Sequence, residues 1–336
     1  MNPVPGTSAR HPLNPMLLVT NFLRFPAKWQ VHGRHGQSMF AANARDFLRH
    51  RSNPDAVFLV NGQPRLICEL AAAQLIGPRR PVVSVDIILR RPADWRTRLQ
   101  HPAVRALLGR VDHFIHYFHD VSGLEEVFGI GRDRSSYVPF KVNLISRHDL
   151  EPSPDGEYVL CFGWSMRDYD TFFAAMESLP YPGAVTRPDP VQLARHKGRF
   201  SRRLDQIPRN IRILEDDKTE QSEVRILSGA KILVLPILKT TLVACGNSTA
   251  LNAMYLGKCV IGSAGPGMTD VFDREIVTFP AEDAGALAEA IRRVWEDDQL
   301  RLSTAAAGRR LALAAGAEPE LYQRLIAAVA EWYGSR

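Results

Sequence analysis

The stretch from residue 230 to residue 272 constrains the fold of this chain more than any other part of the sequence. Residues 231–235 form a short apolar run rich in β-branched side chains, which indicates a buried parallel strand. The sequence GNST at residues 246–249 then opens a helical pattern that ends at Gly257, and residues 259–262 form a second apolar run. A strand, a helix and a strand in this order predict a βαβ unit of a parallel sheet.

The helix start at residues 246–249 is suited to binding an anion. Its first backbone N–H groups have no partner within the helix, two hydroxyl groups lie beside them, and the helix dipole is positive at this end. An ordinary N-cap is the simpler interpretation of these four residues taken alone. Their place between two buried strands favours a diphosphate as the bound anion.

Apolar runs and helical patterns alternate through the rest of the chain. In the first half we expect strands at residues 16–21, 55–60, 81–89 and 112–118, and helices at residues 39–50 (capped by Ser38), 65–75, 95–108 and 121–128. The polar stretch 146–157 contains two prolines and a glycine and predicts a linker. We therefore expect an α/β protein with domains at 1–145 and 158–336, each built on a parallel sheet.

The charge of the chain is divided unevenly between these two parts. Residues 1–150 hold 20 of the 42 Lys and Arg residues and 11 of the 36 Asp and Glu residues, a net charge of +9 against −3 for the remainder. This excess predicts an anionic partner for the first half, such as a membrane surface or a phosphorylated acceptor. No nucleic-acid-binding motif accompanies the basic residues, so we do not expect a nucleic acid partner.

The sequence NAMYLGKCVIGSAGPGMTDVF at residues 252–272 resembles the segment EAMACGKPVIAS…GGIPEIV of GT-B glycosyltransferases. The resemblance implies two Rossmann-like domains whose parallel sheets face each other across a cleft, with a last helix that crosses back to the first domain. It also implies that the C-terminal domain binds a sugar nucleotide. Ala244 and Asn252 stand where the large retaining family has two glutamates, which argues against the retaining mechanism of that family.

The resemblance places candidate site residues on both halves. A glycine turn at Gly163 and the basic Arg167 would meet the donor phosphates; the alternative for Arg167 is a solvated surface residue. Glu215 would lie near the base or ribose, unless it belongs to a solvated acidic loop. Asp86 is the candidate catalytic base, and its alternatives are a helix N-cap and a loop-bracing carboxylate. The other candidate substrate-binding residues are Gly246, Asn247, Ser248, Thr249 and Asn252.

The predicted function is transfer of a sugar from a nucleoside-diphosphate sugar to a glycan or lipid-linked acceptor. We expect no metal and no cofactor, because the amides and hydroxyls of the helix start, together with Arg167, would stabilise the charge on the leaving diphosphate. A sugar-nucleotide epimerase of the same fold and a non-catalytic binding subunit are the alternatives. Widely spaced cysteines and the absence of a signal-peptide pattern predict a cytoplasmic protein, with an anionic membrane surface as a candidate partner.

Overall fold

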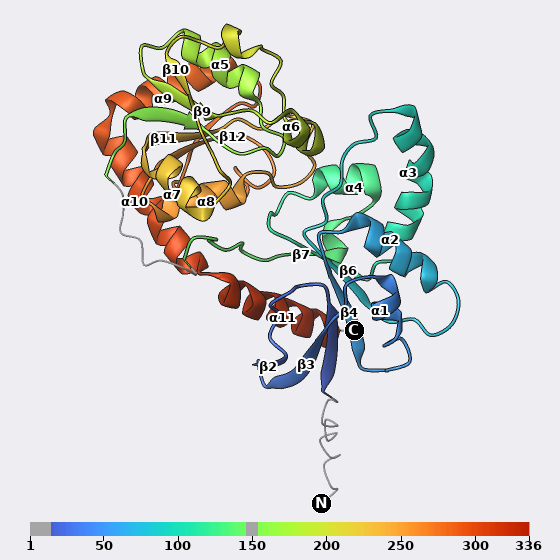
Figure 1. Cartoon of the computed structure of the whole chain (residues 1–336). Coiled ribbons are helices and arrows are strands. Elements are labelled where there is room, and N and C mark those ends of the chain that lie inside the picture. The colour runs from blue at the N-terminus through green and yellow to red at the C-terminus, as the bar shows by residue number, and fades with distance from the viewer. Residues whose placement is uncertain (1–14, 146–153, 336) are drawn as a thin grey trace, which may run out of the picture.

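The computed structural model describes residues 15–145 and 154–335, which form two sheets with flanking helices (Figure 1). Most of the predicted linker lies outside the described residues. We refer to residues 15–145 as the N-terminal half and to residues 154–335 as the C-terminal half. The predicted α/β architecture with two parallel sheets is confirmed, whereas the domain boundaries stay a prediction.

The N-terminal sheet has seven strands in the order β2-β3-β1-β4-β5-β6-β7. All neighbouring strands in it run parallel except β2 and β3, which form an antiparallel hairpin at one edge. The strands are β1 (Met16–Thr20), β2 (Lys28–Val31), β3 (Arg34–Phe40), β4 (Ala56–Asn61), β5 (Val82–Val85), β6 (His113–His116) and β7 (Ser135–Tyr137). The helices of this half are α1 (Ala44–Leu48), α2 (Pro64–Ala73), α3 (Trp95–Leu108) and α4 (Ser122–Phe128), with a 3-10 turn at Arg132–Arg134.

The C-terminal sheet is parallel throughout and has the order β10-β9-β8-β11-β12-β13. Its strands are β8 (Tyr158–Cys161), β9 (Gly183–Thr186), β10 (Ile211–Leu214), β11 (Ala230–Leu235), β12 (Cys259–Ser263) and β13 (Val277–Phe279). The helices are α5 (Tyr169–Glu177), α6 (Pro190–His196), α7 (Glu220–Ser228), α8 (Asn247–Tyr255), α9 (Ala284–Glu296), α10 (Asp298–Ala315) and α11 (Glu318–Gly334), with a 3-10 turn at Leu204–Gln206.

Helices cover both faces of each sheet, as expected for parallel sheets. One face of the N-terminal sheet packs against α1 to α4, and one face of the C-terminal sheet packs against α5, α6 and α9. The second face of the C-terminal sheet packs against α7, α8 and α10.

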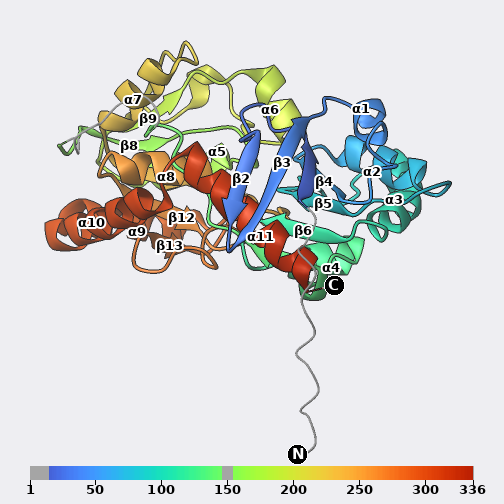
Figure 2. The ribbon, with the colours of Figure 1, turned by 90° about the horizontal axis from the view of Figure 1, so that it is seen from below.

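The second face of the N-terminal sheet is covered by α11, which follows the C-terminal sheet in sequence. Leu321, Leu325 and Val329 of this helix are buried against apolar side chains of β1, β4, β5 and β6. Figure 1 shows α11 leaving the C-terminal half and running alongside β2, and Figure 2 shows the same helix against the N-terminal strands from below. The apolar side chains of α11 therefore complete the core of the N-terminal half.

The predicted start of the helix at residues 39–50, with Ser38 as its cap, is wrong. Residues 38–40 belong to β3 and pair with β1, and α1 begins only after Asn43, whose side chain accepts a hydrogen bond from the Asp46 amide. His32 and Gly33 have φ angles of 47° and 76° and join β2 to β3 as a two-residue hairpin turn. The hairpin forms the edge of the sheet, and its Trp29 and Val31 pack into the core cluster that α11 covers.

Candidate functional site

A cavity of about 590 Å³ lies at the carboxyl ends of the C-terminal strands, where open α/β sheets bind their ligands. Its walls come from the turn between β8 and α5, from α6, from the loop that precedes α7 with the first turn of that helix, and from the start of α8. Five of the predicted site residues line it. The lining residues are Phe162, Gly163, Trp164, Ser165, Arg167, Gln192, His196, Asp216, Lys218, Thr219, Glu223, Gly246, Ser248 and Thr249.

The guanidinium group of Arg167 is buried in the wall of this cavity. The residue is only 1% exposed, which excludes the surface alternative, and its Nε donates to the Phe162 carbonyl at 2.8 Å. Its Nη1 has no hydrogen-bond partner among the residues that the structure describes. Burying a cation whose N–H group has no acceptor destabilises the folded protein, and an anionic ligand that accepts from this group would remove that cost in free energy.

Two glycines make room for this guanidinium. Gly163 and Gly246 have φ angles of 94° and 92°, a conformation that favours glycine. A Cβ atom at Gly163 would lie 2.8 Å from Arg167 Nη2, and one at Gly246 would lie 3.3 Å from Arg167 Nη1. Both glycine turns are therefore required for the arginine to sit between β8 and α8.

The first turn of α8 presents backbone and hydroxyl groups to the cavity. Gly246 occupies the N-cap and has no side chain with which to cap the helix, so the amides of the first turn are left for another acceptor. The Ser248 hydroxyl accepts a hydrogen bond from Asn143 Nδ2 at 2.5 Å, and Thr249 lies beside it on the cavity wall. These groups and Arg167 form one anion-binding surface.

The other predicted substrate-binding residues lie outside the cavity. Asn247 Nδ2 donates to the Tyr117 carbonyl of the N-terminal half at 3.0 Å. Asn252 is buried, and its Oδ1 accepts from the Asn143 amide at 2.9 Å. Glu215 is exposed and accepts from Arg187 Nε at 2.9 Å. Contact of these residues with a substrate stays a prediction.

Glu223 is a cavity residue that the sequence analysis missed. It lies on α7, and its Oε1 accepts a hydrogen bond from Asn252 Nδ2 at 2.8 Å. Burial raises the pKa of the Glu223 carboxyl above its usual value. Nothing local in the sequence distinguishes Glu223 from Glu220, the other acidic residue of α7, because the position of the Glu223 carboxyl depends on Asn252.

Asp86 directly follows β5 and has a φ angle of 48°, in the left-handed region. Its amide donates to the Ile115 carbonyl at 2.8 Å, which places it beside the end of β6. Burial raises the pKa of the Asp86 carboxyl to about 6. Asp94, and not Asp86, caps the helix that follows. Asp86 does not line the cavity, so its part in the chemistry stays a prediction.

Asp270 connects the two halves near the site. Its Oδ2 accepts hydrogen bonds from the amides of His119 and Asp120, both at 2.7 Å, and its Oδ1 accepts from the Gly267 amide at 2.6 Å. The carboxylate thus holds the loop after β6 against the glycine loop after β12. Three amide donors to one carboxylate form a strong, charge-assisted contact.

The described residues contain neither a metal-binding cluster nor a membrane-spanning helix. Within residues 15–145 and 154–335, no group of three or more His, Cys, Asp and Glu residues is placed to hold a metal ion. No helix in the described part of the chain combines the length and apolar character needed to span a membrane.

Comparison with known families and structures supports the resemblance to GT-B glycosyltransferases. The family model for glycosyl transferases group 1 matches residues 207–311, which include β11, α8 and β12. No curated protein sequence matches the chain.

Solved structures with the same architecture are similar over most of the chain. A sucrose-phosphate synthase from Thermosynechococcus elongatus has a TM-score of 0.63 at 14% identity, covering 96% of this chain and 89% of its own. HepE of Anabaena in complex with UDP and glucose has a TM-score of 0.63 at 11% identity, covering 88% and 86%. An α,α-trehalose 6-phosphate synthase from Burkholderia multivorans has a TM-score of 0.57 at 14% identity, covering 88% and 76%. The predicted GT-B fold is confirmed.

The raised pKa of Asp86 predicts a pH-dependent gain of stability for Asp86→Asn. The folded pKa of about 6 lies above the value of about 3.9 for an unfolded Asp, so the folded protein loses stability as the pH rises from 4 to 6. Asparagine removes the buried charge and tolerates positive φ. Urea unfolding should show a gain of about 1–3 kcal/mol at pH 7.5 that disappears at pH 4.

Asp94→Asn is the matched control for this measurement. Its hydrogen bond from the Thr97 amide lowers the pKa of Asp94, so this variant should lose stability at pH 7.5 instead of gaining it. Equal destabilisation of Asp86→Asn at both pH values would show that Asp86 braces its loop.

Proposed function

We propose that this chain, which has the GT-B fold, transfers a sugar from a nucleoside-diphosphate sugar to an acceptor hydroxyl. The observation that carries the proposal is the buried Arg167 guanidinium, whose Nη1 lacks a partner within the described residues and which lies beside the first turn of α8. A diphosphate would supply the missing acceptor and the negative charge. The family match and the structural neighbours support sugar transfer in general.

The donor is proposed to bind wholly to the C-terminal half. Its diphosphate accepts hydrogen bonds from Arg167, from the amides of the α8 first turn and from the Ser248 and Thr249 hydroxyls. The Glu223 carboxylate is the acceptor that suits the ribose hydroxyls. HepE was solved with UDP, which makes UDP the first nucleotide to test.

The proposed chemistry needs no metal for binding the leaving group. The acceptor oxygen forms a bond to the anomeric carbon of the sugar while the bond from that carbon to the diphosphate oxygen breaks. Arg167 and the α8 amides stabilise the charge that develops on the diphosphate. Asp86 is proposed to take the proton of the acceptor hydroxyl, and its pKa of about 6 suits a general base near neutral pH.

A panel of sugar nucleotides, each incubated with the protein alone and with glycan or lipid-linked acceptors, tests the function directly. Transfer to an acceptor supports the proposal. Release of a free or epimerised sugar without acceptor use would identify an epimerase, and nucleotide binding without any turnover would identify a binding subunit. Repeating the assay with EDTA tests whether a metal ion takes part.

Arg167→Gln should weaken UDP binding by about ten- to a hundredfold, because it removes charge-assisted hydrogen bonds worth about 1.5–3 kcal/mol. Arg292→Gln is the matched control, since Arg292 is a partly exposed arginine of α9 in the same half, pairs with Glu289 and does not line the cavity. Titration calorimetry on both variants, with melting temperatures as a check on folding, decides the assignment. Equal UDP affinity for the wild type and both variants would show that Arg167 does not bind the donor.

Asp86→Asn should leave UDP affinity close to that of the wild type and reduce sugar transfer by about 10²–10⁴-fold, the range for a lost general base. In the wild type, transfer should fall about tenfold per pH unit below pH 6, where the Asp86 carboxyl becomes protonated. Single-turnover assays across pH 5–8 measure both effects. Turnover of the variant within a few-fold of wild type would place the base elsewhere.

The acceptor is proposed to be lipid-linked and presented at an anionic, cytoplasmic membrane surface. The start of α3 supports this, because Trp95 and Leu99 are 69% and 75% exposed and lie one turn apart. Arg96 and Arg98 lie on the same exposed turns, and the net charge of +9 in residues 1–150 complements an anionic lipid surface.

The double variant Trp95→Ser, Leu99→Ser should bind vesicles containing phosphatidylserine at least about tenfold more weakly than wild type, because it removes the apolar side chains that would enter the lipid. Leu302→Ser is the control, since Leu302 is 56% exposed on α10 of the C-terminal half. Co-sedimentation at low and high salt measures binding, which should also weaken with salt. No wild-type binding at low salt would favour a soluble acceptor.

A further inference from the structure

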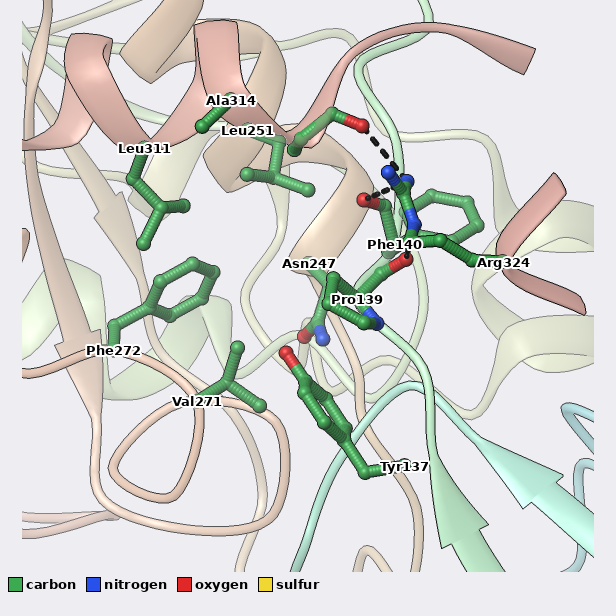
Figure 3. A pocket seen from close by; sticks show the side chains of 11 residues that line it. Tyr137, Pro139, Phe140, Asn247, Leu251, Val271, Phe272, Leu311, Ala314 and Arg324 are labelled. Carbon is green, nitrogen blue, oxygen red and sulfur yellow. Dashed lines mark hydrogen bonds between the residues drawn. The ribbon is translucent and has the colours of Figure 1, made fainter. Parts of the chain in front are cut away.

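A second cavity of about 300 Å³ lies where the two halves meet (Figure 3). The end of β7 and the segment after it supply one wall, α8 and the residues after the glycine loop supply another, and α10 and α11 supply the third. The lining residues are Tyr137, Pro139, Phe140, Asn247, Leu251, Val271, Phe272, Leu311, Ala314, Ala315 and Arg324. We call this cavity the hinge pocket, because both chain crossings between the halves pass through its walls.

The hinge pocket contains one unsatisfied polar atom. Asn247 is only 7% exposed, and its Oδ1 has no hydrogen-bond partner in the described structure. Its Nδ2 is already used, because it donates to the Tyr117 carbonyl. Figure 3 shows the side chain of Asn247 beside the hydroxyl of Tyr137 at one end of the pocket. Burying a hydrogen-bond acceptor without a donor costs free energy of folding. This end of the pocket therefore favours a ligand with a hydrogen-bond donor.

The only cationic side chain among the described residues that line the pocket is already engaged. Arg324 donates to the carbonyls of Ala315 at 2.7 Å, Pro139 at 3.2 Å and Phe140 at 3.3 Å, as the dashed lines in Figure 3 show. These bonds tie α11 to the segment after β7 and to the end of α10. The guanidinium is therefore committed to backbone carbonyls, and the rest of the wall is mostly aromatic and aliphatic. Such a pocket suits an uncharged ligand.

The hinge pocket is separate from the proposed donor site, although both use the first turn of α8. Gly246, Ser248 and Thr249 line the donor cavity, whereas Asn247 and Leu251 line the hinge pocket. The two cavities share no lining residue. A ligand in the hinge pocket would consequently leave room for a sugar nucleotide.

We propose that the hinge pocket binds a small, flat and mostly apolar molecule that carries one hydroxyl group. The hydroxyl donates to Asn247 Oδ1, and the ring system packs between Phe140, Phe272 and Leu311. An apolar cavity of about 150 Å³ holds one benzene ring, so this pocket has the size for two fused rings. Because its walls come from both halves, the occupant stabilises the arrangement of the halves described above.

Binding of 2-naphthol and 2-methoxynaphthalene to the full chain tests the proposal, with saturation-transfer NMR for affinity and thermal unfolding as a second measurement. The two probes have the same ring system and oxygen, but only 2-naphthol can donate a hydrogen bond. The wild type should bind 2-naphthol about tenfold more tightly than 2-methoxynaphthalene and should show a higher melting temperature with it.

Ala314→Trp should fill the pocket and weaken 2-naphthol binding by about tenfold or more, because Ala314 lines the pocket from α10. Leu313→Trp is the matched control, since Leu313 is the preceding residue, is 51% exposed and does not line the pocket. Asn247→Leu should abolish the difference between the two probes. Undiminished 2-naphthol binding by Ala314→Trp, or equal binding of both probes to wild type, would overturn the proposal. No nucleotide enters this experiment, so its failure would leave the proposed glycosyltransferase function untouched.

Discussion

The carboxyl end of β6 is one of the points at which hydrogen bonds fix the two halves to each other. The Tyr117 carbonyl accepts from Asn247, and the amides of the next loop donate to Asp270. These bonds position the first turn of α8, which lies between the two cavities. They are supported by the burial of α11, where each fully buried Leu or Val side chain contributes about 1.5–3 kcal/mol. Apolar burial therefore holds the halves together, and the polar contacts determine where α8 lies between them.

Much of the fold could be predicted because the strands of a buried parallel sheet are continuous apolar runs. The helix α3 was predicted with the bounds that the structure shows, because Asp94 and Gly109 mark its two ends. The edge hairpin of β2 and β3 could not be predicted in the same way. Trp29 and Val31 of β2 pack into the core that α11 covers, and the exposed Lys28 and Gln30 alternate with them. Four alternating residues are too short a pattern to distinguish an edge strand from a basic loop.

The candidate site was predictable where the sequence resembles a known family. Gly163 and Arg167 could be selected because their turn resembles the first βα unit of a GT-B donor domain, and Gly246 because it opens the helical pattern of α8. The burial of Arg167 between the two glycine turns could not be predicted. Asn247, adjacent to Gly246 in sequence, shows the limit of this reasoning. The helical rotation of about 100° per residue turns its side chain away from the side that carries Ser248 and Thr249, toward the hinge pocket. Which side of a helix faces which half is a tertiary property, and a local motif does not contain it.

The position of α11 in the sequence has a consequence for synthesis on the ribosome. The N-terminal strands are made first, but the helix that covers one of their faces spans residues 318–334. The sheet face that α11 covers includes the apolar side chains of Val57, Leu59 and Val83. This face stays exposed, or is covered by a chaperone, until the whole C-terminal sheet has been translated. Vectorial folding, in which each domain closes its core as it emerges, is thus unavailable to the N-terminal half. A truncated nascent chain would present an uncovered sheet face to the cell.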